Sequence, residues 1–393
     1  MNSLRKPGWV MLVAGFVALS FRAALGVEPP AADQAAKPAV AAGSPRIQLA
    51  ILLDTSGSMQ GHINQARTQL WKIVNELATA RREGQPPDLE VALYEYGKSS
   101  LPEDGGYLRQ IVPLTDDLDT LSEELFALET NGGSEHCGQV IEAAVQGLKW
   151  SKSADDLKLI FIAGNEPFTQ GPVDYKQACR SAIEKGITVN TIFCGPEPEG
   201  VGTGWKEGAQ LADGSFLSIN QNEQVAAVRT PYDTKLAELG TKVNQTVVTF
   251  GRDADRLEAL QRVEKADRLA RGAAPAAAAE RASFKGSQQY QVRSDLVEAV
   301  RERRVELDKL SDDQLPEELR GKSLEERKSI LADKEAERTK LQSEIQKLSA
   351  ERKKFIAEHE REQAQSGQKN TFDTAVLRAI REQASKKRFT FAD

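Results

Sequence analysis

The sequence predicts an α/β protein with a doubly wound, mostly parallel sheet, followed by an all-α helical or coiled-coil region. Two observations support this fold class. Apolar runs at 47–53, 157–162 and 187–194 alternate with segments of helical periodicity, as parallel strands alternate with crossover helices. From Pro231 onward no clear strand pattern recurs, and only helical spacing of apolar residues remains.

The elements of the first half follow from local pattern. Apolar runs with β-branched or aromatic residues predict strands at 46–53, 89–96, 157–162, 187–194 and 216–219. Apolar residues three or four positions apart predict helices at 61–81, 118–128, 140–150 and 175–185. Gly105 and Gly106 predict a turn into a strand at 107–112, paired antiparallel with the strand before it.

Size and charge narrow the classes of function. A chain of 393 residues is long for one domain, so two or more units are expected. A net charge of −6 does not suggest the basic surface that nucleic-acid binding requires. The sequence therefore predicts no nucleic-acid partner.

The N-terminus has the features of a secretory signal. Arg5 and Lys6 precede an apolar run over 9–21, and small residues at Ala24 and Gly26 suit cleavage. The run is too short for a comfortable membrane span, so a cleaved signal is favoured over an uncleaved anchor. We therefore expect a periplasmic or secreted protein.

Residues 46–59 are predicted to form a buried strand that is followed by a cluster of oxygen-bearing side chains. Asp54, Ser56 and Ser58 follow the apolar run, and Gly57 permits a tight turn between them. Ligand sites in open α/β sheets form at this edge, and a carboxylate with two hydroxyls suits a hard cation such as Mg²⁺. The alternative is that these residues only make a turn and cap the next helix.

The Asp-x-Ser-x-Ser pattern of 54–58 resembles the metal-ion-dependent adhesion site of the von Willebrand factor A family. The order of elements over 46–222 resembles that family's Rossmann-like fold as well. The resemblance implies a bound Mg²⁺, or Mn²⁺ or Ca²⁺ in its place. It also implies that an acidic side chain of a protein partner completes the coordination sphere.

Two further metal loops of the family match less closely. Ser134 follows paired glycines where the family has Thr, and it is alternatively the cap of the next helix. Gly164, or alternatively Ala163, stands where the family has Asp, and Asn165 and Glu166 follow. An Asp restored at Gly164 is expected to tighten metal binding; if Glu166 already supplies that charge, Glu166→Gln is expected to weaken it. A vestigial site without metal is the alternative. The candidate metal ligands are Asp54, Ser56, Ser58, Ser134, Asn165 and Glu166.

The only cysteines lie in this half of the chain. Glu135, His136 and Cys137 include zinc-ligand types, but no second pair has zinc-like spacing, so a loop beside the cation site is the favoured interpretation. In an exported chain Cys137 and Cys194 are the preferred disulfide pair. The alternative is that Cys179 and both of these are buried free thiols.

Helical patterns organise the second half. Amphipathic spacing predicts a helix over 236–250, an Ala/Pro hinge lies at 273–279, and a helix is expected at 294–310. A capping box at Ser323 and Glu326 starts a long helix to 365, and a final helix covers 372–386. Arg338 and Arg352 fall at heptad seam positions, which favours a hairpin with 294–310 over a homodimeric coiled coil.

These patterns divide the chain into six segments. They are a signal peptide (1–26), an Ala/Pro linker (27–45), the von Willebrand A-like domain (46–222), a helical connector (223–290), a helical hairpin or coiled coil (291–365) and a C-terminal helix (366–393). No nucleophile–base constellation or nucleotide fingerprint is visible, so a binding module is expected rather than an enzyme. The alternative is a metal-independent structural or scaffold protein of the cell envelope.

The signal sequence gives the first testable prediction. We expect export with cleavage near Gly26, so that the mature chain begins near Val27. N-terminal sequencing of the protein recovered from its native host checks this. Recovery of the full-length chain from the cytosol would contradict it.

Overall fold

The computed structural model describes residues 44–219, 228–287, 289–292, 294–365 and 372–391. The predicted signal peptide and nearly all of the Ala/Pro linker lie outside this range. Within the described residues, no helix has the length and apolar character needed to cross a bilayer.

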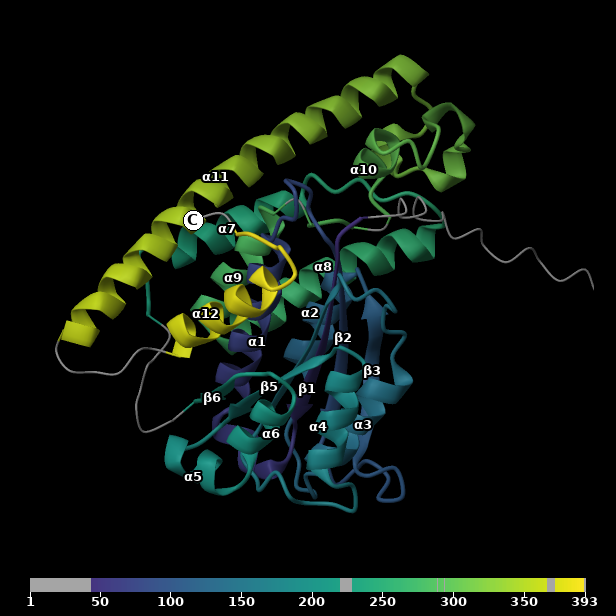
Figure 1. The fold of residues 1–393 in the computed structure, drawn as a ribbon. Coiled ribbons are helices and arrows are strands. Elements are labelled where there is room, and N and C mark those ends of the chain that lie inside the picture. Colours follow the sequence, from purple (N-terminus) through teal and green to yellow (C-terminus); the bar gives the residue numbers. More distant parts are fainter. Residues whose placement is uncertain (1–43, 220–227, 288, 293, 366–371, 392–393) are drawn as a thin grey trace, which may run out of the picture. The chain divides into compact units, whose positions relative to one another are not determined.

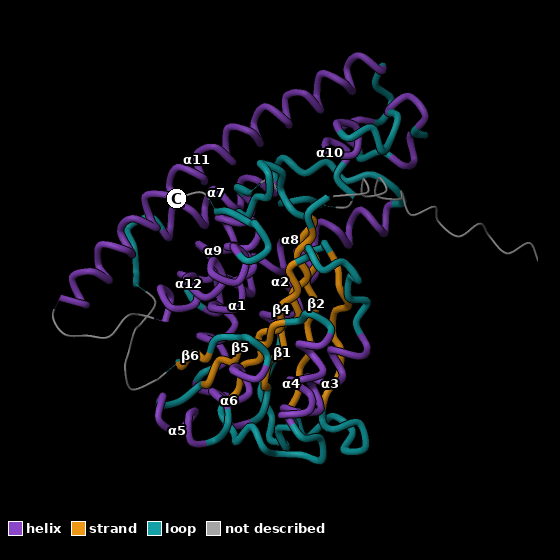
Figure 2. The backbone as a smooth tube through the Cα atoms, in the orientation of Figure 1, coloured by secondary structure: helices purple, strands orange, loops and turns teal. Residues whose placement is uncertain are grey.

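A six-stranded sheet forms the centre of the fold (Figures 1 and 2). The strand order is β3-β2-β1-β4-β5-β6, and every neighbouring pair is parallel except β2 and β3. This confirms the predicted fold class and the antiparallel strand after Gly106. The strands are β1 (Arg46–Asp54), β2 (Asp88–Tyr96), β3 (Leu108–Thr115), β4 (Leu157–Gly164), β5 (Thr188–Phe193) and β6 (Phe216–Ser218).

The central strand β1 is buried on both faces. Leu49 and Ile51 belong to one apolar core, whereas Ala50 and Leu52 belong to the core on the opposite face. Side chains alternate along a strand, so a continuous apolar run is the pattern that two covered faces require. Helices must therefore cover both sides of the sheet.

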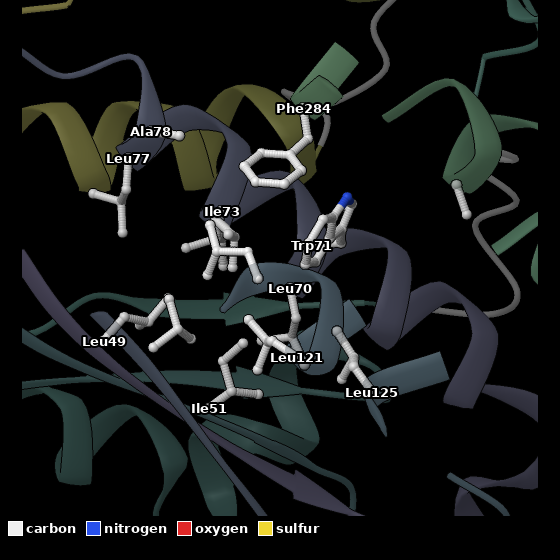
Figure 3. Close-up of a cluster of buried hydrophobic side chains, with 14 of the residues drawn as sticks. Leu49, Ile51, Leu70, Trp71, Ile73, Leu77, Ala78, Leu121, Leu125 and Phe284 are labelled. Atoms are coloured by element: carbon white, nitrogen blue, oxygen red, sulfur yellow. The ribbon is translucent and has the colours of Figure 1, made fainter. Parts of the chain in front are cut away.

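Helices from both halves of the chain build the larger core. Figure 3 shows Leu49 and Ile51 of β1 directed toward α1, and Trp71 of α1 packed edge-on against Phe284 of α9 at 5.5 Å between ring centroids. The helices contributing to this core include α1 (Ile63–Ala78), α2 (Leu118–Ala127), α7 (Asp233–Asn244), α8 (Asp253–Ala273), α9 (Pro275–Lys285) and α12 (Phe372–Ser385). A single core thus joins the sheet to the helical half.

The opposite face is covered by helices of the first half alone. These are α3 (Cys137–Gly147), α4 (Tyr175–Glu184) and α6 (Trp205–Leu211), with the short α5 (Glu197–Gly202) before α6. Figure 1 shows α3 and α4 on the side of the sheet away from α1 and α12. The sequence pattern did not predict α5 or α6, because both are short and contain glycine.

All three cysteines are free and buried, which corrects the preferred disulfide. Cys137 packs in the core on the α3 face, whereas Cys194 packs in the core on the α1 face. The sheet therefore separates the two sulfur atoms that the sequence had paired. The alternative expectation, three buried thiols, is the observed one.

The predicted hinge at 273–279 is instead a buried helix start. Ala274 has an extended backbone, and Pro275 is the first residue of α9. The small side chains of α9 allow this helix to lie close to α1 and α7. The low-complexity sequence at 273–279 therefore reflects tight packing and not a flexible joint. The helix predicted to reach Phe250 ends at Asn244, and Val248 turns into a separate apolar cluster with Leu296.

The expected helix over 294–310 is also shorter than predicted. It forms α10 (Leu296–Arg301), and Arg303 then takes a positive φ of 57° that ends the helix. Three single 3₁₀ turns follow, at Leu307–Lys309, Asp312–Gln314 and Glu317–Leu319. This segment offers too little helix to form the predicted hairpin.

The long helix α11 (Leu324–Gln365) starts with the predicted capping box. The Ser323 backbone N–H donates to Glu326 Oε2 at 2.8 Å, and the Glu326 N–H donates back to Ser323 Oγ at 3.4 Å. The first part of α11 contacts residues 294–310 through Leu331 and Arg338, whereas the following part packs along α7 and α9. Ile345 is fully buried in this following part of the helix. The prediction that Ile345 packs against the 294–310 helix is therefore wrong.

The two arginines that disturbed the heptad seam are buried anchors. Arg352 donates to Asp233 Oδ1 at 2.7 Å and to Glu280 Oε1 at 2.6 Å. Arg338 pairs with Asp295 and donates to the Thr246 carbonyl at 2.6 Å. Each arginine is satisfied by acids from elements that α11 crosses, so these charges fix where α11 lies.

Burial of Ile345 gives the second prediction. Ile345→Asn is expected to lower the free energy of unfolding by about 2–4 kcal/mol, because apolar burial is lost and an amide is buried without partners. Urea denaturation of the full chain measures this. The matched control is Ser343→Asn on the exposed side of the same helix. Equal stability of the two variants would contradict the observed packing of α11.

Candidate functional site

The candidate site lies where β1, β2 and β4 end, at the carboxyl edge of the sheet. The Thr55 N–H donates to the Tyr96 carbonyl at 2.8 Å, and the Asn131 N–H donates to the Thr55 carbonyl at 2.9 Å. The loops after β1 and β2 and the loop before α3 are therefore tied together. Parallel strands bring their following loops to one edge, which is why residues far apart in sequence meet here.

Asp54 is the most enclosed residue of the site, with none of its surface exposed. Its Oδ1 accepts a hydrogen bond from the Ser56 N–H at 2.7 Å. Among the described residues, no group donates a hydrogen bond to its Oδ2. Burial raises the pKa of Asp54 to about 7; the hydrogen bonds from Ser56 oppose the shift and the nearby charge of Glu135 adds to it.

The two serines of the first loop connect Asp54 to the third loop. Ser56 Oγ and Ser58 Oγ are 2.9 Å apart, and Ser58 Oγ donates to Asn165 Oδ1 at 3.0 Å. Ser58 is exposed, so this end of the chain of oxygens opens to solvent. Four of the six predicted ligands, Asp54, Ser56, Ser58 and Asn165, are thus brought together.

Ser134 and Glu166 are not hydrogen-bonded to this chain of oxygens. No hydrogen bond joins Ser134 to Asp54, Ser56 or Ser58, all of which are described. The residue that N-caps α3 is His136, so Ser134 does not have that alternative role either. Glu166 Oε2 accepts from Gln170 Nε2 at 3.4 Å, and the Glu166 carbonyl accepts from Trp205 Nε1 at 2.7 Å.

Glu135 is the acidic residue that the sequence did not assign to this site. Only 6% of its surface is exposed. A Cβ built on the neighbouring Gly97 would lie 3.0 Å from Glu135 Cγ and 2.7 Å from Asp54 Oδ1. Burial raises the pKa of Glu135 to about 7, and the charge of Glu166 adds to the shift. Its position after paired glycines was the available signal, but the resemblance directed attention to Ser134.

His136 and Cys137 have contacts outside the site. His136 Nδ1 is 3.3 Å from Gln139 Oε1, and Cys137 Sγ is 3.7 Å from Tyr96 Oη. Within the described part of the chain, no group of three or more His, Cys, Asp or Glu side chains has an arrangement that holds a metal ion. The geometry therefore gives no support to the zinc interpretation.

Gly164 leaves no room for the aspartate that the family has at this position. A Cβ at Gly164 would lie 2.5 Å from Tyr96 Oη and 3.0 Å from both Asp54 Oδ2 and the Trp205 ring. Real Cβ atoms do not approach other atoms this closely without displacing them. An aspartate at Gly164 would therefore displace its neighbours, and the expectation that it tightens metal binding stays a prediction.

The oxygen atoms of the site fit a hard divalent cation. Asp54 presents a buried carboxylate oxygen without a hydrogen-bond donor, and Ser56, Ser58 and Asn165 add neutral oxygens next to it. Mg²⁺ takes such ligands and retains several waters. An uncompensated buried carboxylate costs free energy, so a cation at this position would offset its desolvation.

The fold and the site together define a doubly wound α/β domain with an oxygen-rich loop cluster at the carboxyl edge of its sheet. Residues 48–201 match the sequence model of the von Willebrand factor type A domain. The chain therefore contains a von Willebrand factor type A domain, as the pattern at 54–58 predicted.

Solved structures with the same domain are similar to this chain at low identity. The SpRpn10 von Willebrand A domain is 15% identical with a TM-score of 0.36, over 46% of this chain and 91% of that domain. The hypothetical protein BatB of Bacteroides thetaiotaomicron is 13% identical with a TM-score of 0.35, over 56% of this chain and 99% of that one. An aerotolerance-related membrane protein of Bacteroides fragilis is 16% identical with a TM-score of 0.32, over 44% and 92%. No curated protein sequence matches the chain.

Crowding at Gly164 gives the third prediction. Gly164→Asp is expected to lower the free energy of unfolding by roughly 1–3 kcal/mol or more, because the new side chain displaces Tyr96 or Trp205. Thermal and urea unfolding measure the change. Gly202→Asp is the matched control, since a Cβ at Gly202 meets nothing within 4 Å. Wild-type stability of Gly164→Asp would contradict the described packing.

Proposed function

We propose that this chain is an exported binding module that uses its von Willebrand A domain to capture a protein partner through a divalent cation. Asp54, Ser56 and Ser58 would hold Mg²⁺, or Mn²⁺ or Ca²⁺ in its place. The observation that supports this most directly is the buried Asp54 Oδ2, which lacks a hydrogen-bond donor beside two hydroxyls. Domains of this family commonly mediate protein–protein interactions and are mostly not enzymes.

Each residue of the site has a distinct part in the proposal. Asp54 supplies the negative charge, and the hydroxyls of Ser56 and Ser58 supply neutral oxygens. Asn165 orients Ser58 and offers a further oxygen. Ser134 and Glu166 remain candidate ligands that would act through water. When bound, the cation supplies positive charge that attracts an acidic side chain of the partner at the solvent-exposed end of the site.

The location of the protein is part of the same proposal. The signal-like segment over 1–26 favours a periplasmic or secreted chain. A periplasmic or secreted binding module meets its partners outside the cytoplasmic membrane. The absence of catalytic function stays a prediction.

A second candidate function is a metal-independent scaffold of the cell envelope. Two observations favour it. The third loop has the neutral Asn165 and the crowded Gly164 in place of a carboxylate, which reduces the charge offered to a cation. Buried Arg281 of α9 also pairs with Asp119 of α2, which fixes the helical half to the sheet domain, as a rigid structural part requires.

Metal titration of Asp54 variants gives the fourth prediction and separates the two candidates. Wild type is expected to bind Mg²⁺ and Mn²⁺ in calorimetry, whereas Asp54→Ala loses binding because the buried carboxylate is removed. Asp54→Asn should lose binding as well while keeping the shape of the side chain. Circular dichroism of both variants should match that of wild type.

An exposed carboxylate outside the site provides the control for this titration. Asp104→Asn removes an exposed carboxylate from the loop before β3 and should leave the titration unchanged. Identical titrations for wild type and the Asp54 variants, or the absence of binding to wild type, would favour the metal-independent scaffold.

A further inference from the structure

We infer that Glu135 supplies the second carboxylate of the cation site and so replaces the acid that the third loop lacks. The inference rests on the proposed function, because it assumes that a cation binds beside Asp54. It extends that function by moving the missing negative charge from the loop after β4 to the loop before α3. Glu135 was not among the metal ligands expected from the sequence.

The first argument is the position of the side chain. Gly97, at the end of β2, separates the two acids: the point that its missing Cβ would occupy is 2.7 Å from Asp54 Oδ1, 3.0 Å from Glu135 Cγ and 3.4 Å from Ser56 Cβ. Its φ of +78° also suits glycine. A larger residue at 97 would occupy the space into which both acids extend, so glycine here keeps them adjacent.

The second argument is that the backbone holds Glu135 in this direction. The Glu135 N–H donates to Gln170 Oε1 at 3.2 Å, which ties the residue to the loop after β4. Gly133 approaches so closely that a Cβ there would be 2.2 Å from the Gly97 carbonyl oxygen. The two loops are therefore in backbone contact, and α3 begins directly afterwards at Cys137. Glu135 is positioned by fixed elements on both sides.

The third argument is charge. Glu135 is 6% exposed, and Asp54 is fully buried. Two enclosed carboxylates close to each other repel when both are ionised, and Asp54 Oδ2 has no donor among the described residues. No cationic side chain is hydrogen-bonded or ion-paired to either acid in the described chain. A divalent ion would compensate both charges at once.

Other residues serve this purpose less well. Gly164 cannot be replaced by an acid without displacing Tyr96 or Trp205. Glu166 is only half-buried, and its carboxylate contacts Gln170 and none of the first-loop hydroxyls. Ser134 has no charge. Glu135 is thus the acid whose burial and proximity to Asp54 match the missing ligand.

Calorimetric titration of the full mature chain with Mg²⁺ and with Mn²⁺ tests the inference. Glu135→Gln is expected to weaken binding at least about tenfold, since ligand charge sets the affinity of such sites. Glu166→Gln is the competing variant, since Glu166 is itself a candidate ligand, and it is expected to weaken binding less than Glu135→Gln does. Glu103→Gln removes an exposed carboxylate outside the site and is the matched control, which should leave the affinity unchanged. Glu135→Asp keeps the charge on a shorter side chain and should lie between wild type and Glu135→Gln.

Thermal unfolding provides a second readout that does not depend on the titration. In excess chelator, Glu135→Gln is expected to melt at or above the wild-type temperature, because a buried charge has been removed beside Asp54. Addition of Mg²⁺ should raise the melting temperature of wild type more than that of the variant. A purely structural role for Glu135 predicts instead that the variant melts lower with and without the ion.

The outcomes separate this inference from the proposed function. Binding by wild type and equally by Glu135→Gln would overturn the role of Glu135 and leave the cation site at Asp54 standing. Weakened binding in Glu166→Gln alone would overturn it and assign the second carboxylate to Glu166. Lack of binding by wild type would overturn both.

Discussion

The burial of β1 on both faces is the constraint on which the rest of the structure depends. Its apolar side chains alternate between two cores, so neither face of the sheet can be left to solvent. Helices α3, α4 and α6 cover one face. The other requires α1 and α2 and, beyond them, helices from the far end of the chain. The same strand ends at Asp54. The packing that stabilises the sheet therefore also places the Asp54 carboxylate in an enclosed position.

Enclosing the Asp54 carboxylate costs folding free energy, and the surrounding glycines make the enclosed position possible. Gly97, Gly133 and Gly164 each lie so close to other atoms that an added Cβ would collide with them. Their absence of side chains lets the loops after β1, β2 and β4 meet, and it leaves Asp54 and Glu135 enclosed together. Such an arrangement is unfavourable for folding alone and favourable for holding a cation, which is the usual relation between stability and a binding site.

The helical half is a structural part of the same unit. Trp71 of α1 contacts Phe284 of α9, and Ile345 of α11 is buried in the core that begins at the sheet. Buried arginines then set the position of α11, because each must lie where its carboxylate partners are. Removing one partner would leave a charge without compensation in a buried place, so these pairs specify one docking geometry more than they add stability.

The sequence by itself determined the fold class, the strands of the sheet, the capping box at Ser323 and the pattern at 54–58, because local periodicity and turn chemistry encode them. It also identified Asp54, Ser56, Ser58 and Asn165, which hydrogen bonds do bring together. Only the tertiary structure decided that Cys137 and Cys194 lie on opposite faces, that 275–285 is a core helix, and that Arg338 and Arg352 are anchors. It likewise placed Glu135 beside Asp54. Contacts between distant residues depend on which faces pack together, and one-dimensional spacing does not contain that information.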